Sequence, residues 1–187
     1  EELEICGVGM NPSRIGILSV LRDMGARIEI KNAREESGEP IADLIVLPSK
    51  LSGVILDGSI IPNIIDEIPI LSIAAAFAEG ETIIRDAAEL RVKESDRLKA
   101  ISDGLLNLGV SHINFDDGIQ IKGNPRLLDL PGPVQIDSYD DHRIAMSFLI
   151  AGLNCNQPIT VLECDNILTS FPAFIELTAS LGYNLEK

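Results

Sequence analysis

The sequence contains no tryptophan, few other aromatic residues and little positive charge, and each shortage narrows the functions open to it. With two tyrosines and five phenylalanines among 187 residues, aromatic stacking is not expected to dominate ligand binding. The formal net charge of −14 argues against a sequence-independent nucleic-acid binder, which needs a basic face. Small anionic ligands remain possible, because a few local cations are enough to bind them. The cations of interest are Arg91, Lys93, Arg97 and Arg143.

The three cysteines, Cys6, Cys155 and Cys164, form an odd set without metal-ligand spacing. This predicts neither a disulfide framework nor a metal site, so we expect small buried thiols and a reduced, cytoplasmic setting. The longest apolar run, residues 68–78, is interrupted by Pro69 and is too short to span a bilayer, so no membrane partner is expected. Neither a signal sequence nor an initiator methionine opens the chain, and we interpret it as a piece of a longer polypeptide.

Hydrophobic periodicity predicts short strands alternating with helices. Strands are expected at residues 2–8, 27–30, 43–47, 82–85, 112–115, 118–122, 134–136, 158–162 and 183–186. Helices are expected within residues 15–24, 66–80, 98–108, 144–153 and 171–181. Asn11 or Ser13 is predicted to cap the first helix, and the second is apolar nearly all round, which indicates burial. Residues 32–40 are expected to form a polar hairpin or short loop.

An internal repeat organises these elements. Residues 21–28, 105–113 and 177–185 share the end of a helix, a glycine and the start of an apolar strand. Two buried helices are also each opened by an acidic residue, Asp66 in one case and Asp141 in the other. The pattern predicts an α/β fold of repeated βαβαββ units, with a first copy that is incomplete at its N-terminus.

Residues 89–99 carry a dense run of charges of both signs between a predicted strand and a predicted helix. Lys93 and Arg97 are four residues apart and Glu94 and Arg97 three apart, so one helical turn can bring them to one face. Free backbone N–H groups at a helix start also favour an anion. Two cations beside a carboxylate could grip an anionic substrate and move a proton. The alternative is a solvated, self-paired helix start, since most surface ion pairs contribute little.

Four motifs carry a resemblance to a known family. In chain order they are Asn11-Pro-Ser-Arg14, Arg91-Val-Lys-Glu-Ser-Asp-Arg97, Asp141-His-Arg-Ile-Ala-Met-Ser147 and Thr169-Ser-Phe-Pro172. Together they resemble the 5-enolpyruvylshikimate-3-phosphate synthase family over essentially the whole chain. Thr169 stands where some members of that family carry a lysine, which resembles the branch often called class II.

The resemblance implies a fold and a missing partner. Family members are more than twice this length and have two globular domains, each of three such repeats, in an arrangement of inside-out α/β barrel type. Residues 1–187 resemble the C-terminal domain and are interpreted as a single globular domain. The expected partner is the N-terminal domain of the same protein, which closes on the substrates from the other side.

The resemblance also implies two catalytic carboxylates. Asp66 matches the family's acidic residue that holds shikimate 3-phosphate through its ring hydroxyls and is often assigned as the base for the 5-hydroxyl. A helix start favours the ionised form that a base needs; the alternative is that Asp66 is only a helix cap. Glu94 matches the carboxylate proposed to carry the proton to and from the enolpyruvyl methylene.

Four further positions match substrate ligands. Lys93 matches a ligand of shikimate 3-phosphate. Arg97 and Arg143 match the pair that binds phosphoenolpyruvate, for which a planar guanidinium is well suited. His142 lies beside the phosphoenolpyruvate site in the family, although a lone histidine is more often structural. The alternative for the arginines is surface pairing with neighbouring acidic residues.

The implied reaction transfers the enolpyruvyl group of phosphoenolpyruvate to the 5-hydroxyl of shikimate 3-phosphate and releases phosphate, in aromatic amino acid biosynthesis. It needs no metal and no organic cofactor. One alternative is an enolpyruvyl transferase that acts on a UDP-sugar. Another is a non-catalytic module that binds anions. In either enzymatic case the chain alone is expected to be inactive, because half of the site lies outside it.

Overall fold

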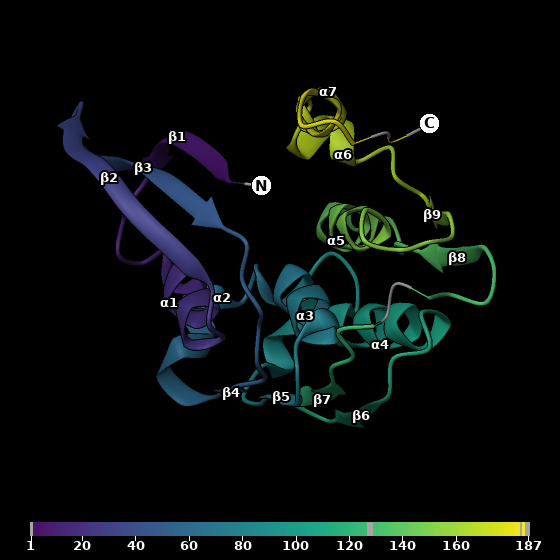
Figure 1. Cartoon of the computed structure of the whole chain (residues 1–187). Coiled ribbons are helices and arrows are strands. Elements are labelled where there is room, and N and C mark those ends of the chain that lie inside the picture. The colour runs from purple at the N-terminus through teal and green to yellow at the C-terminus, as the bar shows by residue number, and fades with distance from the viewer. Residues whose placement is uncertain (1, 127–128, 184, 186–187) are drawn as a thin grey trace.

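The computed structural model describes residues 2–126, 129–183 and 185, and its small β-sheets lie around a central group of helices (Figure 1). The strands are β1 (Leu3–Gly9), β2 (Arg27–Glu36), β3 (Glu39–Leu47), β4 (Ile55–Leu56), β5 (Glu81–Ile84), β6 (His112–Phe115), β7 (Gly118–Lys122), β8 (Val134–Asp137) and β9 (Ile159–Leu162). The α-helices are α1 (Gly16–Asp23), α2 (Ile61–Ile64), α3 (Ile68–Phe77), α4 (Arg97–Asn107), α5 (His142–Gly152), α6 (Ile167–Ser170) and α7 (Phe174–Ser180). The 3₁₀-helices are η1 (Gly58–Ile60) and η2 (Ala88–Val92).

The sheets are versions of one pattern. The largest has the order β4-β5-β7-β6, in which β4 and β5 are parallel and the other two pairs are antiparallel. The sheet β1-β3-β2 corresponds to β5-β7-β6, and the parallel pair β8-β9 corresponds to β4-β5. The helices α1, α4 and α7 are each followed by a glycine in the left-handed region, Gly25, Gly109 and Gly182, with φ of 101°, 72° and 86°, as is usual at a helix C-terminus. The predicted α/β repeat is confirmed.

The helices α3, α4 and α5 pack against one another at the centre, and the sheets lie towards the periphery (Figure 1). As predicted, α3 is buried, and its residues Ile68, Leu71 and Ile73 are 0%, 2% and 4% exposed. The contact between α4 and α5 is close because Gly104 has no side chain. A Cβ at that position would lie 2.1 Å from Cζ of Phe148. This central packing determines where the helix starts lie.

Among the described residues, no single helix is long and apolar enough to cross a membrane. The segments Gly58–Ile64 and Ile68–Phe77 reach that length and composition only together, and they are bent by 109° at the break between them. The second of these segments is the buried helix α3.

The hairpin of β2 and β3 is longer than predicted. We expected strands only at residues 27–30 and 43–47, whereas β2 has ten residues and β3 has nine. Ser37 and Gly38 form the turn with φ of 51° and 85°, the backbone conformation of a tight two-residue hairpin. Cross-strand hydrogen bonds therefore hold polar, exposed residues in strands although their side chains show no apolar alternation.

The first helix begins later than predicted and is not capped by Asn11 or Ser13. It starts at Gly16 without a side-chain cap. Oδ1 of Asn11 instead accepts hydrogen bonds from the backbone N–H and the hydroxyl of Ser13, at 3.0 and 2.8 Å. The cap prediction was wrong because asparagine closes a local turn with the same side-chain oxygen.

The helix predicted at residues 171–181 begins later, as α7, and the short helix α6 lies before the predicted range. Phe171 has an extended φ of −143°, because the proline that follows it disfavours a helical conformation. The second predicted helix also ends early, at Phe77, since Ala78 is extended. The strand predicted at residues 183–186 includes positions outside the described residues.

Candidate functional site

Helix starts meet at one edge of the central helix group. Asp66 precedes α3, Lys93 and Glu94 precede α4, and Asp141 is the N-cap of α5. Packing of the three helices brings together side chains up to 77 positions apart in the sequence. We call the charged residues that meet there the ionic cluster: Asp66, Lys93, Glu94, Arg97, Asp141 and Arg143.

Arg97 is the centre of the ionic cluster. It is the first residue of α4, and its side chain is 0% exposed. Nε donates to Oδ2 of Asp141 at 2.7 Å, Nη1 to Oδ1 of Asp66 at 3.1 Å and Nη2 to Oε2 of Glu94 at 2.5 Å. Each guanidinium nitrogen therefore contacts a carboxylate from a different part of the chain.

Asp141 uses one carboxylate oxygen to cap α5 and the other to hold Arg97. Oδ1 accepts from the backbone N–H groups of Arg143 and Ile144 at 2.9 and 3.4 Å. Oδ2 accepts from Arg97 and, at 3.2 Å, from the hydroxyl of Ser95. Burial by itself raises the pKa of Asp141, but the hydrogen bond and charge of Arg97 and the two N–H groups outweigh it and hold the pKa below its usual value.

Asp66 lies among three cations. Besides Arg97, it has Nζ of Lys93 at 4.0 Å and Nη2 of Arg143 at 3.5 Å from its carboxylate. Nη1 of Arg143 also donates to the backbone oxygen of Asp66 at 3.1 Å. Asp66 does not act as the helix cap, since the N-cap of α3 is Glu67, which makes no side-chain capping bond. Its carboxylate is held instead by the cations that the sequence analysis assigned to substrates.

The alternative of a self-paired helix start is partly correct. Lys93 pairs with Glu89 at 2.5 Å, and Asp96 caps α4 by accepting from the backbone N–H of Lys99. Arg91 is tied to Asp96 and to the backbone oxygens of Phe115 and Asp116. The unpredicted η2 thus places Arg91 as a structural anchor, while Lys93 faces the cluster.

His142 stands apart from the ionic cluster. It is the first residue of α5 and is partly exposed, and its side chain makes no hydrogen bond or ion pair with the rest of the described chain. Thr169, at the position of the absent lysine, donates a hydrogen bond to the backbone oxygen of Asn166 within α6. Over the ranges that the structure describes, no group of three or more His, Cys, Asp or Glu residues could hold a metal ion.

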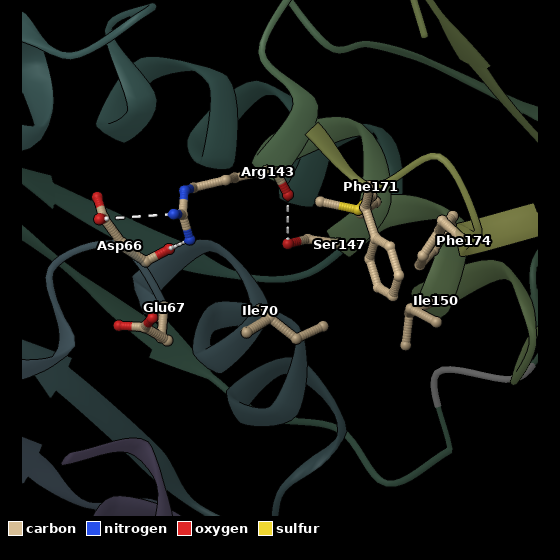
Figure 2. A pocket seen from close by; sticks show the side chains of 9 residues that line it. Asp66, Glu67, Ile70, Arg143, Ser147, Ile150, Phe171 and Phe174 are labelled. Carbon is tan, nitrogen blue, oxygen red and sulfur yellow. Dashed lines mark hydrogen bonds and ion pairs between the residues drawn. The ribbon is translucent and has the colours of Figure 1, made fainter. Parts of the chain in front are cut away.

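A pocket of about 240 Å³ lies beside the ionic cluster (Figure 2). Asp66 and Arg143 point towards one another at one end. The other end is apolar and is lined by Ile70, Ile150, Phe171 and Phe174, among others. Arg97 and Glu94 do not line the pocket.

The contacts of Arg97 and Ser95 with Asp141 were not predicted from the sequence. The acidic residue before the α5 helix was a visible capping signal. No local pattern linked it to an arginine 44 positions earlier in the chain, because that contact depends on how α4 and α5 pack.

Comparisons with known proteins show the family. The family model described as EPSP synthase (3-phosphoshikimate 1-carboxyvinyltransferase) matches residues 1–177. The chain is 51% identical over 179 residues to a 3-phosphoshikimate 1-carboxyvinyltransferase of Magnetococcus marinus, covering 96% of this chain and 40% of that protein. It is 45% identical over 184 residues to the protein of that name from Coxiella burnetii, covering 98% and 41%.

Solved structures agree in fold. An EPSP synthase from Acinetobacter baumannii matches with a TM-score of 0.91 and 43% identity, covering 96% of this chain and 41% of that one. The enolpyruvyl transferase NikO from Streptomyces tendae matches with a TM-score of 0.74 at 21% identity, covering 98% and 39%, which shows the fold alone. The predicted fold class is therefore confirmed. The chain spans about 40% of the length of the curated relatives it matches, and it belongs to the EPSP synthase (3-phosphoshikimate 1-carboxyvinyltransferase) family.

Proposed function

We propose that the ionic cluster is one wall of a site where the full-length protein transfers the enolpyruvyl group of phosphoenolpyruvate to the 5-hydroxyl of shikimate 3-phosphate. Family membership supports the reaction. The observation that carries the assignment to these residues is the convergence of Lys93, Arg97 and Arg143 on Asp66, at 4.0, 3.1 and 3.5 Å. Three fixed cations can bind two substrates that both carry a phosphate group, and the neighbouring carboxylate can accept the proton that the 5-hydroxyl must lose.

Each carboxylate has a separate task. Asp66 takes the proton of the 5-hydroxyl while that oxygen bonds to C2 of phosphoenolpyruvate, and Glu94 gives a proton to C3. The product of this step is a tetrahedral phosphorylated intermediate with a methyl group. In the second step the bond between C2 and the phosphate oxygen breaks and phosphate leaves, while Glu94 takes a proton back from the methyl group and the double bond between C2 and C3 forms again.

The cations act by position and charge. Arg97 and Arg143 hold phosphoenolpyruvate, and Lys93 holds shikimate 3-phosphate. At an effective dielectric constant of about 20, one charge pair at 4 Å is worth roughly 4 kcal/mol. Holding the reacting atoms in line adds the advantage of an intramolecular reaction.

The opposite wall comes from the remainder of the protein. The relatives are more than twice as long as the chain, and a half-site open to water neither orients both substrates nor excludes solvent. The chain alone is therefore inactive, and its principal partner is the rest of the same polypeptide.

The test is phosphate release by the full-length product of the gene that encodes this chain. Release from phosphoenolpyruvate should depend on shikimate 3-phosphate. Phosphate release that depends on a UDP-sugar would instead support the alternative enolpyruvyl transferase. If no phosphate is released with either acceptor, the remaining interpretation is a non-catalytic module that binds anions. In deuterated water, Glu94→Gln should slow deuterium incorporation into the enolpyruvyl methylene; unchanged exchange would remove Glu94 from the proton transfer.

A further inference from the structure

Arg97 is closed to any ligand in this structure. Each of its three nitrogens contacts a carboxylate, and because the side chain is 0% exposed its two remaining N–H donors are closed to solvent as well. The neighbouring Arg143 is 30% exposed and lines the pocket, whereas Arg97 does not. If phosphoenolpyruvate binds both arginines, one carboxylate must first leave Arg97.

The three carboxylates differ in how readily they can leave. The side chain of Asp141 is 0% exposed, that of Asp66 is 25% exposed and that of Glu94 is 53% exposed. A carboxylate that is itself buried against Arg97 is costly to remove, whereas one that water already reaches is more easily replaced. Glu94 also lies outside regular secondary structure, between η2 and α4. Within the described chain, the contact with Arg97 is its only side-chain hydrogen bond or ion pair.

We propose that Glu94 is a specificity-determining residue that occupies Nη2 of Arg97 until an anionic group of the substrate takes its place. The inference rests on the proposed function and adds a second role for Glu94. Exchange of one carboxylate for another anionic oxygen keeps the number of charge-assisted hydrogen bonds at Arg97 unchanged, so the exchange has a small net cost.

This arrangement selects among anions. A simple anion such as acetate gains one contact only by displacing a carboxylate that is tethered to the same chain, so it competes poorly. Phosphoenolpyruvate carries a carboxylate and a phosphate, and it contacts Arg143 as well as Arg97. Glu94 is released only when such a ligand is in place, and its carboxylate then takes up a proton from solvent, which it can pass to C3 of the substrate.

The test uses two changes of Glu94 and one matched control in the full-length protein. Glu94→Asp keeps the charge but is one methylene too short for the contact with Arg97. Glu94→Gln keeps the length of the side chain but removes its charge. It replaces Glu94→Asp in the measurements if Glu94→Asp destabilises the protein. Glu89→Gln removes a carboxylate from the same stretch, but one that pairs with Lys93 rather than Arg97.

The first measurement is calorimetric titration of phosphoenolpyruvate into protein saturated with shikimate 3-phosphate, with and without excess acetate at constant ionic strength. We expect Glu94→Asp to bind phosphoenolpyruvate about 2- to 5-fold more tightly, the range for loss of a weak ion pair whose carboxylate is open to water. Acetate should weaken this binding in Glu94→Asp but have little effect in the wild type or in Glu89→Gln. Wild-type affinity together with acetate insensitivity in Glu94→Asp would overturn the inference.

A second measurement does not depend on the proposed reaction. Acetate is titrated into the wild type, Glu94→Asp and Glu89→Gln, and binding is followed by broadening of its methyl NMR signal. Only Glu94→Asp should show added binding, and equal broadening in all three refutes the exchange. If wild-type protein binds no phosphoenolpyruvate, the proposed function fails, while the acetate titration still decides the role of Glu94.

Discussion

Nε of Arg97 donates a 2.7 Å hydrogen bond to Oδ2 of Asp141, and both side chains are completely buried. This pair joins the start of α4 to the start of α5. It places Arg97 and Arg143 beside one another, because Asp141 also holds the backbone N–H of Arg143.

Replacing Asp141 with asparagine should destabilise the protein strongly. Asparagine still caps α5, but Arg97 loses the fully buried member of its three carboxylate partners, and breaking a buried pair costs about 3–5 kcal/mol. The free energy of unfolding from urea titration measures this loss. The control is Asp140→Asn, an exposed neighbour with φ of 55°, a conformation that asparagine tolerates. A loss no larger than in that control would mean that the pair contributes little.

Lowering the pH should reduce the difference in free energy of unfolding between the wild type and Asp141→Asn. The pKa of Asp141 is held below its usual value despite burial, chiefly by Arg97. A carboxyl group with a lowered pKa contributes stability above the pKa of the unfolded chain and loses it as the pH falls through the lower folded value. The urea midpoints of the wild type and Asp141→Asn should therefore approach one another as the pH is lowered from about 7 to about 3. A gap that stays constant over this range would contradict the assignment.

Asp43 should stabilise the pairing of β1 and β2 with β3 in the first sheet. Its carboxylate accepts from Nδ2 of Asn32 and from the backbone N–H of Gly7, each at 2.8 Å. These partners lie in the register shifts on either side of β3. The hydrogen bond from Asn32, and then that from Gly7, lowers the pKa of Asp43, so its contribution is present at neutral pH and lost as the pH falls below about 4.

Hydrogen exchange tests this role of Asp43. Asp43→Ala should speed exchange of the amides of β1 and β2 while leaving α5 protected. Glu39→Ala, an exposed change on the same strand, should leave both regions as in the wild type. Equal exchange in the two variants would show that Asp43 does not hold the register shifts.

Arg97→Ala in the full-length protein should destabilise the fold, because it leaves Asp141 buried without its partner, and in the protein that remains folded it should impair the use of phosphoenolpyruvate. Loss of a charge interaction of roughly 4 kcal/mol corresponds to about a 10³-fold fall in kcat/KM for that substrate. Steady-state kinetics with each substrate varied in turn measures the effect. Arg85→Ala is the matched control, since Arg85 pairs with Asp117 and stacks on Phe115 away from the ionic cluster. Wild-type kinetics in Arg97→Ala would refute the assignment.

Local signals in the sequence predicted much of the fold. Residues 112–115 and 118–122 were expected as strands and are β6 and β7, because alternation and turn residues are read over a few positions. The turn at Asn11 and the break before Pro172 were missed, since the same residue types also serve other local structures. The charged residues of 89–99 indicated a site, but their partners came from other helices and depended on tertiary packing.

Asp66 and Asp141 precede α3 and α5, which occupy the same place in successive repeats, and both bind Arg97. Repetition has thus placed two versions of one acidic position around a single guanidinium. The side chain of Asp141 is completely buried, whereas that of Asp66 is a quarter exposed. In a repeated unit of this kind, one copy of a residue can stabilise the fold, and the equivalent residue in the other copy is then free to acquire a role in ligand binding.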